Sequence, residues 1–467
     1  MDNRNHNILD DDRIGRLLLK LSLPAFFGMF VITLYNVVDT IFIGHYVGPL
    51  GIAGLSIVFP VQMLSMGIGH LTGVGGASLM SRLIGGGNIP RAEHTLGNAV
   101  TSTIALSALI MIIGLSNTDF WLRLMGASET ILPYARDYMK IILIGMFFQT
   151  FAVALNSLIR AEGNARIPMA GMIIGAVLNI ILDAIFIIPL GMGIRGAALA
   201  TVIAQLISVV YFMSYYFTGK GFLGLHLRNL IAKWSILRSI FAIGIASFSM
   251  IVASSLSAVI VNRMLVYYGG DIAVSAFGII NRIMMFAIMP GIVIGQGLQP
   301  ILGFNYGAKR YARALRAIVM AIAAATACCV VVFLVLYFAP EPFVRIFSTD
   351  SALVALGSYA AKRTFLALYL VGFIMVGSMV FQSIGKAVQS FVTAISRPAL
   401  FLIPLVFILP YCWQLEGVFL AFPVSEALTF MLTLILLIPQ VRMFRREGMS
   451  AQNMNTSVGQ TKMKSPE

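Results

Sequence analysis

Residues 73–93, GVGGASLMSRLIGGGNIPRAE, have a counterpart in residues 295–315, GQGLQPILGFNYGAKRYARAL. The two segments share glycines and basic residues in the same order, and a match of this length indicates an internal duplication. The chain therefore consists of two related halves. Three pairs of residues keep one spacing of 222 positions: Gly75 and Gly297, Gly85 and Gly307, and Arg91 and Arg313.

Two further motifs repeat in the same order. RAEGNA, around Gly163, returns as QSIGKA around Gly385, again 222 positions later. PLGMGIRGAALA from Pro189 and PYCWQLEGVFLA from Pro410 follow with a spacing of 221. The duplication thus extends over most of the chain.

The composition excludes a soluble globular protein. Of 467 residues, 59% are hydrophobic and 11% charged, and the mean hydropathy is +0.92. Apolar runs of about 20 residues recur between glycine, proline and basic residues, as in membrane-spanning helices, whereas an outer-membrane barrel shows ten-residue alternation. The sequence predicts an all-α integral membrane protein.

We expect twelve transmembrane helices in two pseudo-symmetric six-helix bundles. Six helices per half is an even number, so both halves enter from the same side and are related by an axis along the membrane normal. The predicted helices are 17–43, 51–79, 95–117, 131–157, 167–188, 195–217, 239–265, 273–300, 315–338, 353–380, 390–409 and 417–438. The expected parts are an N-terminal tail (1–16), a first bundle (17–218), a linker (219–238), a second bundle (239–440) and a disordered tail (441–467).

The formal net charge of +14 is explained by lysines and arginines in the connections on one side of the membrane. Lys and Arg occupy alternate connections and the C-terminal tail, which predicts that both termini are cytoplasmic. Loops around Asp119, Glu129 and Asp350 are poorer in cations. Because the cations form no single face, no nucleic-acid partner is expected. No cleaved signal peptide is apparent, and neither the three Cys nor the five His have metal-ligand spacing.

A polar pair interrupts one lipid-facing run, LNIILDAIFIIP at residues 178–189. Asn179 and Asp183 are four residues apart and share a helical face. A charge at this depth is expensive and usually faces a protein-lined or watery cavity. Counting residues from the helix ends places Asp39, Asp183, Tyr138 and Thr201 at one depth, with Tyr35, Asn36 and Asn179 one turn deeper.

Two carboxylates in a poorly solvated cavity do not both ionise cheaply. The pair can take up a proton, or a sodium ion when Asn179 and Thr201 complete the shell around Asp39 and Asp183. Either ion could bias the first bundle between two conformations. The alternative is that these acids only cap or cross-link helices. The repeat spacing gives the counterparts in the second half of Asp39, Asp183, Asn179, Thr201 and Tyr138, which are, in that order, Ile260 or Val261, Pro404, Leu400, Phe422 and Ala360. None of these is an acid, so the fold does not require the cluster.

Other polar residues are candidates for a substrate cavity. Glu426 either receives a cationic substrate or pairs with Arg282 or Arg263, and both alternatives stay open. Arg282 fits an interior hydrogen-bonding role better than substrate binding. The candidates for this cavity are Tyr35, Asn36, Asn156, Gln296, Arg282 and Glu426.

Several segments together resemble the multidrug and toxic compound extrusion (MATE) transporters. They are LSLPAFFGMFVITLYNVVDTIFIG, RAEGNAR, LNIILDAIFI, GIRGAALATVIAQ and QSIGKA, and the resemblance covers roughly residues 15–440. It implies cation-coupled export of diverse, often cationic compounds by alternating access. It also implies that Asp39, Asn179, Asp183 and Thr201 bind H⁺ or Na⁺, and that Pro24 bends the first helix. ASSLSAVIVN and GFIMVGSMVFQS lack the acids of another branch, so the chain is more similar to the branch of DNA-damage-inducible and staphylococcal exporters.

The leading hypothesis is therefore an antiporter of the bacterial inner membrane that exports small organic compounds in exchange for H⁺ or Na⁺. No cofactor is expected, membrane lipid is the surrounding partner, and a monomer suffices for a pathway. A flippase for a lipid-linked or polysaccharide precursor is the alternative, kept open by Arg263 and Arg282. A membrane-embedded enzyme lacks a nucleophile or metal set in the sequence and is disfavoured.

Overall fold

The computed structural model describes residues 8–11 and 13–462, and every regular element in them is helical. The side chains of residues 36, 40, 41, 44, 49 and 451–462 lie outside this description. The elements are η1 (Ile8–Asp10), α1 (Ile14–Tyr46), α2 (Pro49–Gly85), α3 (Ile89–Ser116), α4 (Thr118–Leu124), α5 (Leu132–Ala161), α6 (Arg166–Ile187), α7 (Gly193–Phe217), η2 (Leu227–Leu230), α8 (Trp234–Gly307), α9 (Tyr311–Phe338), α10 (Glu341–Arg345), α11 (Ser351–Thr364), α12 (Leu368–Ile384), α13 (Ala387–Ile395), η3 (Ser396–Leu402) and α14 (Ile403–Lys462).

The described helices account for the expected spans. Nine helices are long and apolar enough to cross a membrane, and α11 with α12 forms a tenth span bent by 51°. Two of these runs are double, because Gly270 (φ 64°, ψ −165°) breaks α8 and Gln414 (φ 45°, ψ −127°) breaks α14. The ten runs thus correspond to twelve passes in the described chain, and the predicted fold class is confirmed.

The chain divides into two compact units. Unit 1 comprises residues 1–10, 20–80 and 89–256, and unit 2 comprises residues 11–19, 81–88 and 257–467. The boundaries after residues 19, 80 and 256 fall inside the continuous helices α1, α2 and α8. The division of the sequence into two six-helix bundles joined at 219–238 stays a prediction.

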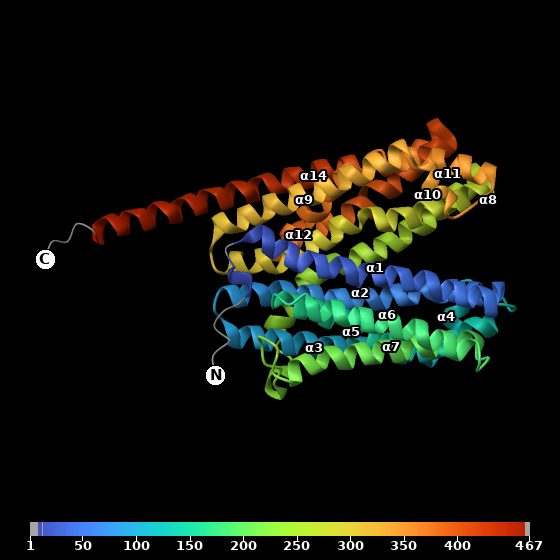
Figure 1. Ribbon diagram of the computed structural model, residues 1–467, viewed down its shortest axis with the longest axis horizontal. Helices are drawn as coiled ribbons and strands as arrows, with labels where there is room; N and C mark the ends of the chain where they lie inside the picture. Colours follow the sequence, from blue (N-terminus) through green and yellow to red (C-terminus); the bar gives the residue numbers. More distant parts are fainter. Residues whose placement is uncertain (1–7, 12, 463–467) are drawn as a thin grey trace. The chain divides into compact units, whose positions relative to one another are not determined.

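In unit 1, α5 packs against α3 and α7, and α6 packs against α7 (Figure 1). One core cluster of this unit joins Leu122 of α4, Tyr138 and Leu143 of α5, and Ala198 of α7, all buried. Close backbone approach requires glycine where α2 meets the first part of α8: a Cβ on Gly244 would lie 1.7 Å from Leu71 O. The helices of unit 1 are therefore in contact along small-residue faces, as is common in membranes.

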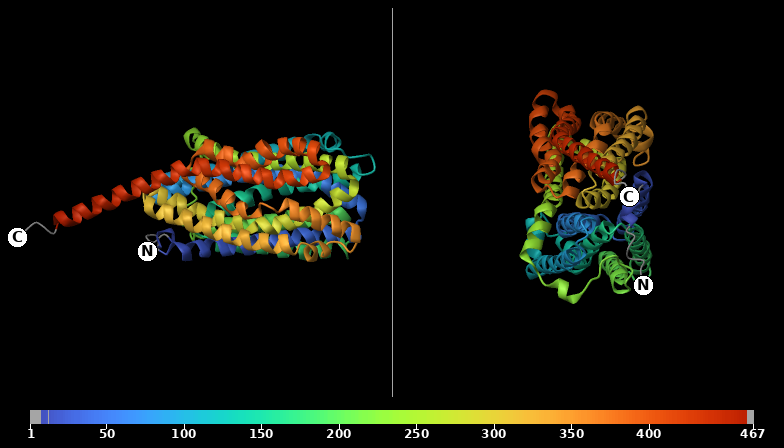
Figure 2. Two further views of the ribbon diagram at one scale, coloured as in Figure 1. Left: turned by 90° about the horizontal axis from the view of Figure 1, so that it is seen from above. Right: turned by 90° about the vertical axis from the view of Figure 1, so that its left-hand side faces the viewer.

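In unit 2, α12 packs against α9 and α14, with the Phe277 and Phe422 rings 5.3 Å apart in the core. A π-helical segment, η3, links α13 to α14. The final helix α14 continues through Lys462 and extends beyond the other helices of its unit (Figure 2). The tail that we expected to be disordered from residue 441 is thus helical through Lys462, in keeping with a segment that has no proline between Val441 and Lys462.

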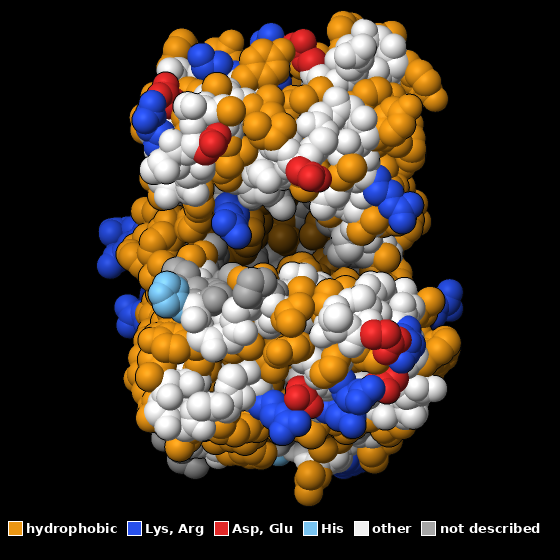
Figure 3. Space-filling view, turned by 90° about the vertical axis from the view of Figure 1, so that its right-hand side faces the viewer, with side chains coloured by type: hydrophobic (Ala, Val, Ile, Leu, Met, Phe, Trp, Pro, Cys, Tyr) orange, Lys and Arg blue, Asp and Glu red, His pale blue; other side chains and the backbone are white. Residues whose placement is uncertain are grey.

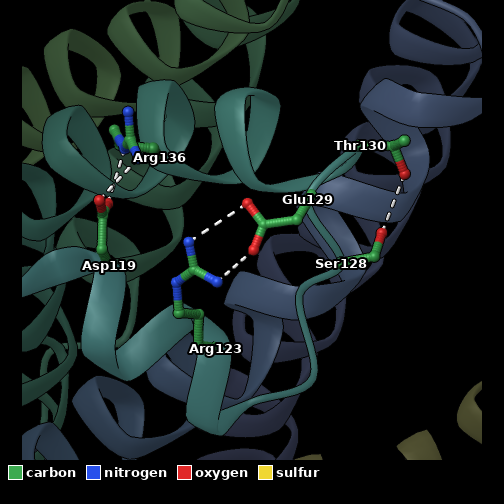
Figure 4. Close-up of polar contacts among 6 residues, drawn as sticks. All are labelled: Asp119, Arg123, Ser128, Glu129, Thr130 and Arg136. Atoms are coloured by element: carbon green, nitrogen blue, oxygen red, sulfur yellow. Dashed lines mark hydrogen bonds and ion pairs between the residues drawn. The ribbon is translucent and has the colours of Figure 1, made fainter.

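Around Asp119 and Glu129, a region that we expected to be poorer in cations, arginines of α4 and α5 pair with the acids. Acidic and basic side chains lie next to each other over the face in Figure 3. Asp119 accepts two hydrogen bonds of 2.6 Å from Arg136, and Glu129 is paired with Arg123 (Figure 4). Asp119 and Glu129 are therefore balanced locally, whereas Asp350 caps α11 by accepting a hydrogen bond of 2.8 Å from Leu353 N. The Lys and Arg of the alternate connections remain the basis for predicting topology.

Candidate functional site

The structure brings together two carboxyl groups from α1 and α6. Asp39 and Asp183 lie close enough for their carboxyl groups to interact directly. Asp183 is fully buried, and one oxygen of each carboxyl group, Oδ1, is buried without a hydrogen-bond partner. A hydrogen bond between two carboxyl groups requires a proton on one of them. The pair therefore holds acceptor atoms that the protein itself leaves unsatisfied.

An amide and a hydroxyl extend this pair. The Asn179 side chain, 2% exposed, lies between Asp183 and Thr201. With its amide turned to satisfy both neighbours, Asn179 donates to Asp183 Oδ2 at 3.2 Å, and its oxygen accepts from Thr201 Oγ1 at 3.3 Å. The four-residue spacing of Asn179 and Asp183 on α6 thus puts both side chains on the face that α7 covers.

Two phenols lie beside the carboxyl pair. Tyr138, on α5, is buried, accepts a hydrogen bond of 3.2 Å from Gln62 Nε2, and lies in electrostatic range of both acids. Tyr35, one turn before Asp39 on α1, is in the same range. Gln62 was missed in the sequence because a lone glutamine in an apolar helix carries no spacing signal.

We define the acid cluster as Asp39, Asp183, Asn179, Thr201 and Tyr138. No lysine or arginine contacts the carboxyl pair in the described part of unit 1. Carboxylate, amide and hydroxyl oxygens are ligands that suit a hard monovalent cation, and the same atoms hold a proton equally well. The unpartnered oxygens of Asp39 and Asp183 are consistent with either ion. The described residues contain no group of three or more His, Cys, Asp or Glu side chains that could hold a metal ion.

The other candidates are dispersed. Asn156 lies 18 residues after Tyr138 on α5, or about 27 Å along the helix, and so cannot join the acid cluster. The side chain of Asn36 is outside the described set. Pro24 lies inside the continuous helix α1, where it removes one backbone hydrogen bond. In unit 2, Gln296 is partly buried and Arg282 is exposed.

Glu426 has a partner that neither sequence alternative included. It is 1% exposed, and its Oε1 lies 3.7 Å from Nη2 of Arg397. The alternative of a pairing with Arg282 or Arg263 is therefore wrong, because the ion pair of Glu426 among the described residues is with Arg397. Arg397 lies in the π-helical segment η3, whose wider turn changes which residues face α14. The spacing of residues along the sequence does not indicate this π-helical turn.

The same π-helical segment changes the comparison between the halves. Leu400 and Pro404, the expected counterparts of Asn179 and Asp183, are exposed, so they do not occupy the equivalent buried face. Two residues further on, Leu402 and Val406 are 6% and 0% exposed and belong to the core of unit 2. Among the described residues of this stretch, both the exposed positions given by the repeat spacing and the buried ones beside them are thus apolar or proline.

Comparison with known proteins agrees with this architecture. A family model described as MatE matches residues 24–185 and 246–408. The chain belongs to the MatE family. Its two matched segments begin 222 residues apart, the spacing of the repeat. As a MatE family member the chain is a transporter and not an enzyme, and the predicted family is confirmed.

Individual relatives of this MatE family member are multidrug exporters. The multidrug export protein MepA of Staphylococcus haemolyticus is 28% identical over 431 residues, covering 91% of this chain and 94% of MepA. The solved structure of the MATE multidrug transporter DinF-BH in complex with a drug-like compound is 40% identical, with a TM-score of 0.88, and the match covers 95% of this chain and 99% of DinF-BH. An outward-facing multidrug resistance MATE transporter is 26% identical, with a TM-score of 0.89 and coverage of 94% and 98%.

Proposed function

We propose that this protein exports small organic, often cationic, compounds in exchange for H⁺ or Na⁺, and that the ion binds at the acid cluster. The observation that carries the proposal is the pair of carboxyl groups, Asp183 buried and Asp39 partly buried, each with a buried unpartnered oxygen and without a neighbouring cation in the described residues. A like-charged pair of this kind is stable only when a proton or another cation joins it. The site therefore has a built-in requirement for the coupling ion.

Ion binding changes the charge of the cluster and so favours one conformation of the transporter over another. Asp39 and Asp183 receive the ion, Asn179 and Thr201 hold Asp183 in place, and Tyr138 and Gln62 fix the wall beside Asp39. Asn156, Gln296, Arg282 and Glu426 stay candidates for substrate contact. The relatives named as multidrug exporters, and the complex of DinF-BH with its drug-like compound, support a drug-like substrate class.

We also propose a bacterial inner-membrane location with both termini in the cytoplasm, because Lys and Arg are concentrated in alternate connections. A monomer contains the complete acid cluster, since all its residues lie in unit 1.

The test is efflux of ethidium and of a cationic rhodamine dye from proteoliposomes, with a pH gradient and a sodium gradient imposed separately. We expect one gradient to drive efflux by the wild type, and Asp39→Asn and Asp183→Asn to reduce it to the level of protein-free vesicles. Asp137→Asn is the matched control, because Asp137 is an acid of α5 at the surface, paired with Arg195. Size-exclusion chromatography shows whether each variant is folded.

Full efflux by both folded aspartate variants would exclude the acid cluster as the coupling site. If neither gradient moves either dye through the wild-type protein, the substrate class is wrong. A flippase for a lipid-linked precursor, which the exposed Arg263 and Arg282 would suit, then becomes the leading candidate.

A further inference from the structure

The linker between α7 and α8, residues 218–233, is held tightly to unit 1 by its backbone. Asn98 on α3 donates to Asn229 O at 3.2 Å and to Ile231 O at 3.1 Å, and its Oδ1 accepts from Lys233 N at 2.6 Å. Thr101, one turn later, donates to Leu230 O at 2.8 Å. The main chain of the linker is thus turned inward, toward α3.

Two acidic side chains complete this anchoring. Glu93 on α3 accepts a hydrogen bond of 3.0 Å from Gly224 N, and Glu162 at the end of α5 accepts one of 3.0 Å from Phe222 N. Glu162 is 5% exposed and also accepts from the Tyr215 hydroxyl. Both carboxyl groups accept hydrogen bonds from the backbone of the linker, so neither is directed at its outer surface.

The anchored backbone leaves large apolar side chains on the outside. Leu227 is 86% exposed, Ile231 is 65% exposed and Trp234 is 73% exposed. They alternate with cations: residues 218–238 contain Lys220, Arg228, Lys233 and Arg238 and no acid. Lys220 and Arg228 are exposed, whereas the Lys233 ammonium lies 3.1 Å from His94 Nε2. We name this outer surface, made of Lys220, Leu227, Arg228, Ile231 and Trp234, the linker face.

The position of the linker face decides what covers it. Both flanking helices, α7 and α8, are long and apolar enough to span the membrane, so the segment that joins them lies at the membrane surface. Tryptophan is enriched at that level, and lysine and arginine near it attract anionic headgroups. Its apolar side chains continue the lipid-facing surface of the helices, for example Phe217, which is 74% exposed at the end of α7.

We propose that the linker face is a docking surface for anionic phospholipids. Leu227, Ile231 and Trp234 enter the interfacial region of the bilayer, while Lys220 and Arg228 contact phosphate groups. The hydrogen bonds that Asn98, Thr101, Glu93 and Glu162 make with the linker keep these side chains directed at the lipid. Docking requires no rearrangement, because the face is already exposed.

The experiment uses the fluorescence of Trp234 in the full-length protein. The chain has three tryptophans, so Trp121→Phe with Trp413→Phe leaves Trp234 as the single emitter. The protein is placed in phosphatidylcholine nanodiscs that contain a small share of either brominated phosphatidylglycerol or brominated phosphatidylcholine. Acrylamide reports access from water in parallel.

We expect brominated phosphatidylglycerol to quench Trp234 more strongly than brominated phosphatidylcholine, and acrylamide to quench it weakly. Lys220→Gln and Arg228→Gln should each lower the preference for phosphatidylglycerol about fivefold. The control is the variant that retains only Trp121. This side chain on α4 packs against the core of unit 1 and donates to Ile113 O, so its emission should not respond to either substitution.

Three results would overturn the proposal. Equal quenching by the two brominated lipids would exclude recognition of anionic headgroups. Strong quenching by acrylamide with none by lipid would mean that the linker face is in water. Protection from all three quenchers would mean that a protein partner or a second copy covers the linker face instead of lipid.

Discussion

The two halves of this transporter solve the same problem of a buried carboxylate in opposite ways. In unit 1, Asp183 lies beside a second acid, Asp39, and no cation of the described protein neutralises the pair. In unit 2, Glu426 has its own cation, Arg397, with 3.7 Å between the charged groups. A like-charged pair depends on an ion from outside, whereas an opposite pair is complete within the protein. The difference indicates why ion coupling is expected in the first half.

The difference between the two units is tested most directly at Asp183. Asp183→Asn keeps the size and hydrogen bonding of the side chain but removes one of the two like charges. We expect the loss of all gradient-driven efflux, because the pair no longer requires an ion. Proteoliposome efflux measures this, and an active Asp183→Asn variant would show that the two halves do not differ in coupling.

Arg397→Met tests the oppositely charged pair of unit 2, Arg397 and Glu426. It leaves Glu426 buried without its cation, which should lower the free energy of unfolding by about 3 kcal/mol. The double variant Arg397→Met with Glu426→Leu should recover most of that loss, since it removes both charges. Thermal unfolding in detergent measures both variants. A double variant no more stable than Arg397→Met would mean that the pair does not act as a unit.

Asn179→Leu gives unit 1 the residue that the repeat spacing places at Leu400 in unit 2, where Leu402 nearby is buried. Asp183 then loses the amide that holds it, and we expect the apparent affinity for the coupling ion to fall about tenfold. The matched change is Leu402→Asn, which should reduce thermal stability without altering ion dependence. Efflux measured over a range of ion concentrations distinguishes the two. Equal ion dependence in Asn179→Leu and wild type would remove Asn179 from the site.

The smallest effect is expected at Glu162, outside the spanning segments. Burial raises the pKa of Glu162 from 4.5 to about 8, although hydrogen bonds from Phe222 N and Tyr215 oppose the shift. The folded protein therefore holds a proton there that the unfolded chain has lost, and this contribution to stability is complete below pH about 4.5 and declines as the pH rises to about 8. The counterpart of Glu162 in the repeat is Ile384, which does not titrate.

Glu162→Gln mimics the protonated acid at every pH. The Tm of this variant should equal that of the wild type near pH 5 and exceed it by at least about 2 °C near pH 8. Thermal unfolding at a series of pH values measures the difference. A constant difference over that range would mean that Glu162 does not titrate in the folded protein.

The sequence by itself determined the all-helical membrane fold, the twelve spans and the duplication, because these depend on the length of apolar runs and on motif spacing along one dimension. It also brought Asp39, Asp183, Asn179 and Thr201 to similar depths, because rise per residue converts helix position into height. Their roles in coupling stay predictions. The short helices α4 and α10 carried no comparable signal.

Only the tertiary structure decided which helix faces meet. The partner of Glu426 is Arg397 and not Arg282 or Arg263, since the π-helical turn of η3 rotates the following residues in a way that spacing does not reveal. Gln62 beside Tyr138, and the anchoring of the linker by Asn98, join residues 76 and more than 130 positions apart. Such contacts depend on the packing of distant helices, which local sequence patterns do not encode.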